Sequence, residues 1–112
     1  MSDTDILRAN FTISDAAKRE FENLRRFWND NVPDPAGVLV VQWAFWHFNS
    51  GEKAENVLVS FYGQSELPRV AQGIQRVSGL DLVFNTLPEY LPKFEGKVLD
   101  HTPERSFFLR KP

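Results

Sequence analysis

The chain has 112 residues, a size that suits one domain with one hydrophobic core, and its 42% hydrophobic and 25% charged residues are typical of a globular protein. Its net charge is −2, and basic and acidic residues are interleaved without a basic stripe, so we expect no nucleic-acid binding. It contains no cysteine, which excludes disulfides, thiolate catalysis and thiolate-held metal or iron-sulfur sites.

The N-terminal stretch carries no targeting pattern. Residues 1–5 are acidic and polar, without the basic and apolar regions of a secretory signal. No apolar segment approaches the roughly 20 residues that a membrane-spanning helix needs. We therefore expect a cytoplasmic protein with no membrane association, one domain over residues 1–112, and a loosely held segment at residues 1–10.

The first helix is predicted from about Asp15 to Asn29, after a short strand at Phe11–Ile13. Ser14 is a typical N-cap residue, and an acidic residue follows it in the first turn, where it interacts favourably with the helix dipole. Apolar residues recur at spacings of four, three and four, which predicts one buried helix face. These residues are Ala17, Phe21, Leu24 and Trp28.

The most apolar stretch is Val38–Phe48, which reads Val-Leu-Val-Val-Gln-Trp-Ala-Phe-Trp-His-Phe. It is rich in β-branched and aromatic residues, so we interpret it as the central strand. Both alternating sets of positions are apolar, and only Gln42 and His47 interrupt them. We expect this strand either to be buried on both faces or to present one face to another subunit.

The rest of the chain predicts one more helix and several short strands. Residues 49–54 form a turn, and Glu55–Tyr62 returns as the second strand of an antiparallel hairpin. Helical spacing of apolar residues predicts a helix over Ser65–Arg76, capped by Ser65. Short strands are expected at residues 80–84, 97–101 and 106–110. The sequence therefore predicts an α+β domain of about six short strands, covered by one main N-terminal helix and a shorter second helix.

The C-terminal third resembles a known family. It contains an apolar strand and turn (residues 82–91), a Gly before a short strand ending in Asp (residues 94–100), and a closing Phe-containing strand (residues 106–109). These features resemble the HesB-like domain of the A-type iron-sulfur carriers, and residues 11–24 look like that family's opening strand and first helix. The resemblance implies a mixed β-sheet domain. It is specific only from about Leu82 onward.

The cluster ligands of that family are missing here. Its carriers bind iron or a cluster through one cysteine after the first long strand and a Cys-x-Cys pair before the last strand. The pair would fall within residues 103–105, and the loop of the first cysteine corresponds to the tryptophan-rich strand that runs through His47. We therefore expect a cysteine-free divergent member that carries no cluster and no other cofactor.

Sequence motifs for catalysis or metal binding are also missing. His47 and His101 are the two histidines, and with Asp81, Asp100 or Glu104 they offer metal ligands, but their spacing matches no metal motif. We interpret them as a strand-end residue and a turn residue. No serine lies in a Gly-x-Ser-x-Gly elbow, and the glycines are too sparse for a phosphate loop. We expect neither a metal site nor catalytic residues, and so no enzyme.

Aromatic residues of the central hairpin are the remaining site candidates. Core packing is the simplest role for them, and a ligand pocket or a subunit interface are the alternatives. The favoured function is action through protein contacts, as a homodimer or with a protein partner. The alternative is a small-molecule-binding protein or minor enzyme with a pocket between the sheet and the first helix, with Trp46, His47 and Tyr62 at its mouth. The candidate residues are Trp43, Phe45, Trp46, His47 and Tyr62.

Overall fold

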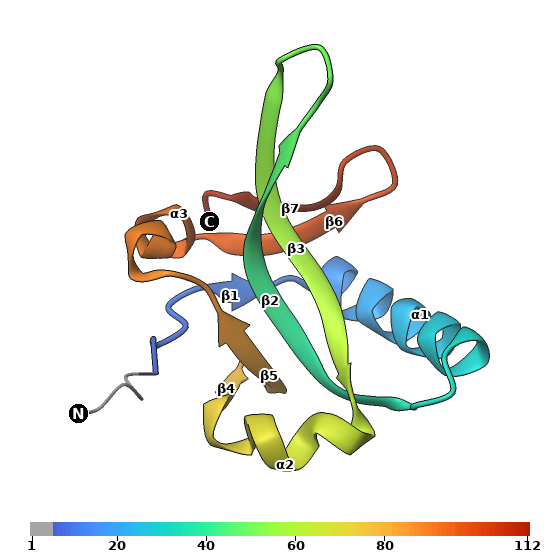
Figure 1. Cartoon of the computed structure of the whole chain (residues 1–112). Coiled ribbons are helices and arrows are strands. Elements are labelled where there is room, and N and C mark those ends of the chain that lie inside the picture. Colours follow the sequence, from blue (N-terminus) through green and yellow to red (C-terminus); the bar gives the residue numbers. More distant parts are fainter. Residues whose placement is uncertain (1–5) are drawn as a thin grey trace.

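Two β-sheets and one long helix surround the hydrophobic core (Figure 1). The structure is a computed structural model, and it describes residues 6–112. The strand orders are β3-β2-β5-β4 in one sheet and β1-β6-β7 in the other. This is the α+β architecture expected, with seven strands in the described residues. The elements are β1 (Thr12–Ile13), α1 (Asp15–Asn31), β2 (Ala36–His47), β3 (Lys53–Gly63), α2 (Leu67–Val70), β4 (Ile74–Val77), β5 (Leu80–Asn85), α3 (Leu91–Phe94), β6 (Val98–Thr102) and β7 (Ser106–Arg110), with 3₁₀ turns at Gln64–Glu66, Ala71–Gly73 and Pro88–Tyr90.

The N-cap predicted for α1 is confirmed. The Ser14 Oγ accepts a hydrogen bond from the Ala17 backbone N–H at 3.1 Å and donates one to Asp100 Oδ1 at 2.6 Å. The cap therefore also ties the helix to β6. On the predicted apolar face, Phe21 stacks on Phe107 of β7, with ring centroids 5.3 Å apart, and the helix continues two residues beyond the expected end.

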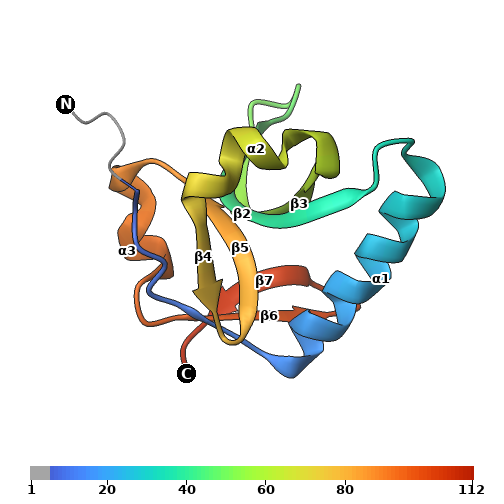
Figure 2. The same cartoon turned by 90° about the horizontal axis from the view of Figure 1, so that it is seen from below.

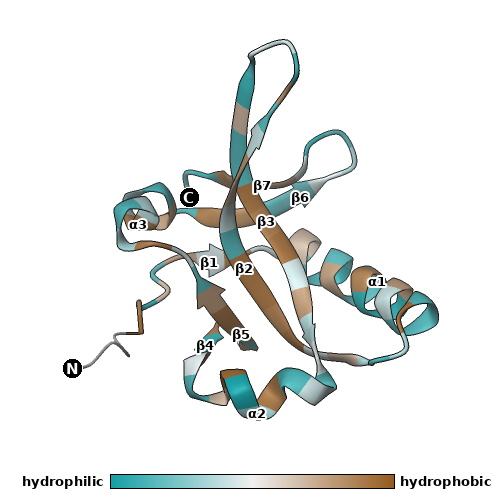
Figure 3. Ribbon diagram, in the orientation of Figure 1, coloured by the Kyte–Doolittle hydropathy of each residue, from teal (hydrophilic) through white to brown (hydrophobic). Residues whose placement is uncertain are grey.

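The first half of β2 is buried on both faces, which is one of the two alternatives that its sequence left open. Leu39 and Val41 face the core between the sheets, while Val38 and Val40 face the opposite way, and all four are at most 4% exposed. Figure 2 shows the segment around α2 on one side of the four-stranded sheet and β6 and β7 on the other. The sheet thus has a second cover, and no partner subunit is needed to bury residues 38–41. Figure 3 shows the matching concentration of hydrophobic residues in the lower half of the hairpin.

The helix predicted over residues 65–76 is confirmed in part, because residues 64–73 form one short helical segment of 3₁₀ and α turns. The α-helical part is the single turn Leu67–Val70, and Ile74–Val77 forms β4, which pairs antiparallel with β5. Ser78 and Gly79 have φ values of +50° and +84°, the backbone that a two-residue hairpin turn requires. Pairing with β5 therefore overrides the helical spacing. Ser65 does not cap a helix with its side chain and donates its hydroxyl to Asp34 instead.

Two side chains hold the described part of the N-terminal segment in place. Gln75 accepts a hydrogen bond from the Ala9 backbone N–H and donates one to the Leu7 carbonyl, while the Asn10 carbonyl accepts from the Gly96 N–H. The Asn10 amide also reaches Glu95. The expectation of a loose N-terminus falls partly on residues 1–5, which lie outside the described residues.

Candidate functional site

The distal half of the β2–β3 hairpin projects beyond the end of β5 (Figure 1). Burial falls along β2 in the same direction: Phe45 is 46% exposed, Trp46 40% and Phe48 53%. At the tip, the Phe48 carbonyl accepts a hydrogen bond from the Gly51 N–H, and the Phe48 N–H donates to the Glu52 carbonyl. Three aromatic side chains are therefore presented on a closed, regular hairpin.

One edge of β2 is open over the same residues. β5 runs parallel to β2 and pairs with it only from Leu39 to Gln42. The Phe48 N–H bond to Glu52 fixes the alternation of backbone groups, because every second residue of an antiparallel strand faces its partner. The N–H and C=O groups of Trp43, Phe45 and His47 therefore point away from β3. On that side the Trp43 N–H faces the carbonyl of Asn85, as the parallel pairing of Gln42 with Asn85 requires. No described strand pairs with the Trp43 carbonyl or with the backbone groups of Phe45 and His47.

Trp43 is anchored at the start of this open edge. Its Nε1 donates a hydrogen bond to Glu55 Oε1 at 2.8 Å, and its ring lies edge-on to the ring of Phe94 at 5.8 Å. The Lys93 ammonium lies 5.2 Å from the Trp43 ring centroid and 3.3 Å from Glu55 Oε1. The hydrogen bond from Trp43, together with Lys93, lowers the pKa of Glu55. Trp43 is thus a half-buried structural residue.

Phe45 lies against Tyr90, which ends the 3₁₀ turn Pro88–Tyr90 after β5. The two ring centroids are 5.1 Å apart, and the rings are tilted by 56°. Burial raises the pKa of the Tyr90 hydroxyl, with a further contribution from the neighbouring Glu89 carboxylate. This contact fixes the position of the Phe45 side chain while nearly half of it stays exposed.

Two pockets flank the distal hairpin. The first, which we call the edge pocket, has a volume of about 350 Å³ and lies where β5 leaves β2. The second, the Trp46 pocket, has a volume of about 330 Å³ and lies between the hairpin, α1 and β7. A further hollow of about 310 Å³ is lined by hairpin residues alone, Phe45–His47 and Lys53–Glu55. The edge pocket is lined by Gln42, Trp43, Phe45, Asn85, Thr86, Leu87 and Tyr90, and the Trp46 pocket by Leu24, Trp46, Asn56, Val57, Leu58, Val59, Ser106 and Phe107.

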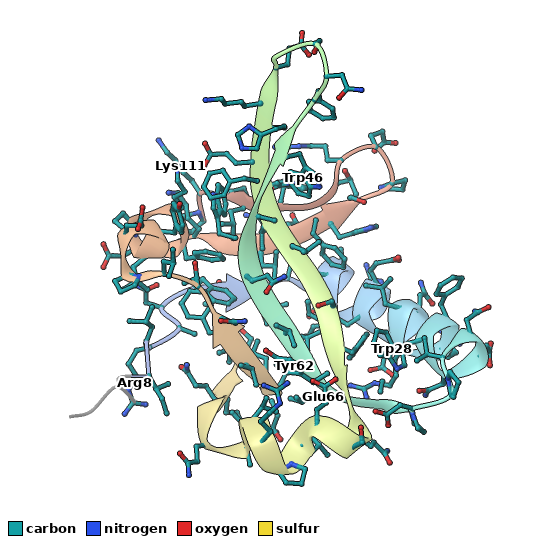
Figure 4. The ribbon with its side chains drawn as sticks, in the orientation of Figure 1. Arg8, Trp28, Trp46, Tyr62, Glu66 and Lys111 are labelled. Carbon is teal, nitrogen blue, oxygen red and sulfur yellow. The ribbon has the colours of Figure 1, made fainter. Side chains whose placement is uncertain are left out.

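Tyr62 does not join the other candidate residues. It pairs with Val38 at the base of the hairpin, whereas Trp46 pairs with Ala54 near the tip. Figure 4 shows Tyr62 near the base of the hairpin and Trp46 well above it. The guanidinium of Arg69 covers the Tyr62 ring at 5.3 Å. A pocket with Trp46, His47 and Tyr62 together at its mouth is therefore not formed.

The two histidines are also separate. His47 ends β2 and is exposed, while His101 lies in β6 with its ring 4.9 Å from that of Phe107. Within residues 6–112, no group of three or more His, Asp or Glu side chains is arranged to hold a metal ion. None of the helices formed by these residues is long and apolar enough to cross a membrane.

Asp100, a metal-ligand candidate from the sequence, instead joins three elements. Its carboxylate accepts hydrogen bonds from the Ser14 hydroxyl, from the His101 backbone N–H at 2.8 Å and from Arg110 Nε at 2.7 Å. These donors, the Ser14 hydroxyl first, lower the pKa of Asp100 to about 2. Its role is to connect the N-terminus of α1, β6 and β7.

Neither a protein-family model, a curated protein nor a solved structure matches the chain. Its resemblance to HesB-like domains therefore rests on the residues quoted from the sequence. What this chain does has to be argued from its own geometry.

Sequence reasoning missed the residues that complete the edge pocket. Tyr90, Asn85 and Thr86 come from the end of β5 and the segment after it, about forty positions from Phe45 along the chain. The parallel pairing of β2 with β5 brings them together. The sequence predicted both strands but carried no signal for their pairing or register.

Proposed function

We propose that this protein acts through protein contacts, and that its partner at the open edge of β2 is a second copy of the same chain. The single observation that carries this proposal is the unpaired edge at Trp43–His47, which combines free backbone groups with exposed aromatic side chains. An extended partner strand satisfies such an edge by adding to the sheet. We assign no catalytic residue.

The edge lacks the features that protect sheet edges from pairing. Proteins commonly block an exposed edge with lysine, proline, a bulge or an inward charge. Residues 43–47, all of them described, read Trp-Ala-Phe-Trp-His and contain no Lys, Glu, Asp or Pro. The irregularity in the β2–β3 register lies at the other end of the strand, between Ala36 and Val38. On β3, by contrast, the paired positions carry charges, because Lys53 lies opposite His47 and Glu55 lies opposite Phe45.

A second copy fits because antiparallel pairing of two identical edges is self-complementary. A two-fold axis near Phe45 places Phe45 opposite the same residue of the partner, and the Trp43 carbonyl opposite the N–H of the partner's His47. Each hydrogen bond contributes about 1 kcal/mol net, and the aromatic side chains add buried area, while association costs translational and rotational freedom. These terms predict a dissociation constant on the order of micromolar to millimolar.

Sedimentation velocity over a wide range of protein concentration tests this proposal. We expect the wild type to convert from monomer to dimer as concentration rises. Phe45→Asp places a charge on the edge and should keep the protein monomeric. Phe27→Asp is the matched control, because Phe27 is also exposed, at 67%, but lies on α1. A wild-type chain that stays monomeric throughout, or a Phe45→Asp variant that dimerises equally well, would refute the proposal.

We further propose that the chain is a cysteine-free relative of the HesB-like carriers. Two findings support this. The order β1, α1, β5, β6, β7 follows the order of elements that the resemblance implies. The segments where that family carries its cysteines also come close together, because Trp46 and Ser106 line the same pocket. The cysteine ligands of one cluster have to lie close together in space. In this chain the corresponding pocket is lined by Leu24, Trp46 and Phe107 instead.

The loss of cluster binding has its own test. Anaerobic incubation with iron and sulfide should leave the protein without charge-transfer absorbance, since no thiolate is available. A cluster chromophore formed in a stoichiometric amount would contradict this part of the proposal. It would not bear on the proposal that the chain dimerises.

A further inference from the structure

The edge pocket occupies a position where sheets commonly bind ligands. β2 and β5 run parallel, and β5 leaves the sheet after Asn85, which pairs with Gln42. In open α/β sheets, ligands bind in the crevice outside the carboxyl ends of parallel strands. Here the pocket lies outside the carboxyl end of β5 alone, because β2 continues to His47. The volume of about 350 Å³ falls within the range of small-molecule sites.

Three aromatic rings and two amides supply the walls. Trp43 and Phe45 come from β2, and Tyr90 comes from the turn after β5. Trp43 is held by Glu55 and Phe94, and Phe45 is held by Tyr90, so these rings are already positioned. Gln42 adds a donor and an acceptor, and Asn85 adds an acceptor, while its amide N–H donates to the Tyr62 hydroxyl at 3.4 Å.

The outward backbone carbonyl of Trp43 adds another acceptor beside the same pocket. All seven lining residues are uncharged. The nearest charged side chains along Trp43, Lys93 and Glu55, are paired with each other at 3.3 Å. An anionic ligand therefore finds no free positive charge in the walls and also meets the Glu89 carboxylate beside Tyr90, whereas a flat neutral ring finds both stacking surfaces and hydrogen-bonding groups.

Thr86 provides an independent observation. Its Oγ1 is buried and has no hydrogen-bond partner among the described residues, and Thr86 lines the edge pocket. Buried polar side-chain atoms are nearly always paired, so an unpaired one requires an explanation. Rotation of the Thr86 side chain about χ1 turns this hydroxyl toward the pocket, where the N–H or O–H group of a ligand supplies the missing partner.

We infer that the edge pocket binds a small uncharged heteroaromatic ring that carries a donor and an acceptor on its edge, such as a nucleobase or a ring carboxamide. The ring packs against Trp43, Phe45 and Tyr90, and its polar edge meets the amides and Thr86. This inference goes beyond the proposed self-association and does not depend on it, because every lining residue comes from one chain.

The test uses backbone amide NMR of the full chain, at a concentration where sedimentation shows monomer. Adenosine and nicotinamide are the probes, toluene is the apolar control and benzoate the charged control. We expect the two neutral heteroaromatic probes to shift the amide signals of residues 42–45 and 85–87 in a saturable way, and the controls to leave them unchanged. No saturable shift with either probe, or an equal response to toluene, would overturn the inference.

Thr86→Val separates ligand binding from folding. The valine has nearly the same shape but no hydroxyl, so we expect binding of the responding probe to weaken roughly fivefold to tenfold. The urea midpoint of the variant should be unchanged or higher, because a buried unpaired hydroxyl is removed. Unchanged probe affinity would overturn the role of Thr86 in the site. Because the measurement is made on the monomer, its outcome is distinct from the outcome of the dimerisation test.

Discussion

Replacement of Asp100 by asparagine tests whether one carboxylate holds three elements together. Asp100 accepts hydrogen bonds from Ser14 at the start of α1, from Arg110 in β7 and from the backbone of β6, and its side chain is 17% exposed. Asparagine keeps the shape, but it removes the negative charge and turns one acceptor into a donor that faces the Arg110 guanidinium.

The size of the effect follows from the pKa of Asp100. A fall of this pKa from 3.8 to about 2 corresponds to about 2 kcal/mol, at about 1.4 kcal/mol for each pKa unit. Because the folded-state pKa is the lower one, this stability is present above pH 3.8. It is lost as the pH falls from there through about 2. We therefore expect Asp100→Asn to lower the free energy of unfolding by about 2 kcal/mol at pH 7.

Urea unfolding at pH 7 and at stepwise lower pH measures this prediction. The difference between the wild type and Asp100→Asn should shrink as the pH approaches 2. Asp81→Asn is the control, because the Asp81 side chain is 59% exposed in its pair with Arg76, and it should change stability by less than about 0.5 kcal/mol. A loss at Asp100 no larger than that of the control, or a loss that does not vary with pH, would refute the reasoning.

Three further substitutions test the core, a turn and the helix cap by urea unfolding. Phe94→Ala should cost about 3–5 kcal/mol, because Phe94 is fully buried, while Phe27→Ala on the exposed side of α1 should cost little. Gly79→Ala should cost about 1 kcal/mol or more, since φ is +84° there, whereas Gly73→Ala has normal φ and ordinary contacts and should be near neutral. Ser14→Ala removes the cap and should cost about 1 kcal/mol. Equal losses within either matched pair, or no loss at Ser14, would contradict the packing described here.

The elements that the sequence predicted well are those set by local chemistry. The Ser14 cap, the apolar face of α1 and the two strands of the hairpin depend on residues close in sequence. Because both alternating sets of positions in β2 are apolar, the sequence also indicated burial of residues 38–41 on both faces as one of two alternatives. The sequence did not indicate what covers the second face, which is the segment around α2.

The predictions that failed depend on contacts between distant segments. Residues 65–76 have helical spacing, yet pairing with β5 through the turn at Ser78–Gly79 makes their last part a strand. In the same way, the open edge of β2 exists because β5 leaves it after Gln42. Strand order and register are long-range properties, and one sequence alone carries little information about them.

Hydrogen exchange of the β2 backbone amides tests the central claim most directly. Phe45 and His47 direct their N–H groups to the open edge, whereas those of Ala44 and Trp46 face β3. We predict that the Ala44 and Trp46 amides are protected at every protein concentration. The Phe45 and His47 amides should exchange fast in the dilute protein and become protected as it dimerises. Exchange at Phe45 and His47 that does not depend on concentration, while sedimentation shows a dimer, would contradict pairing through this edge.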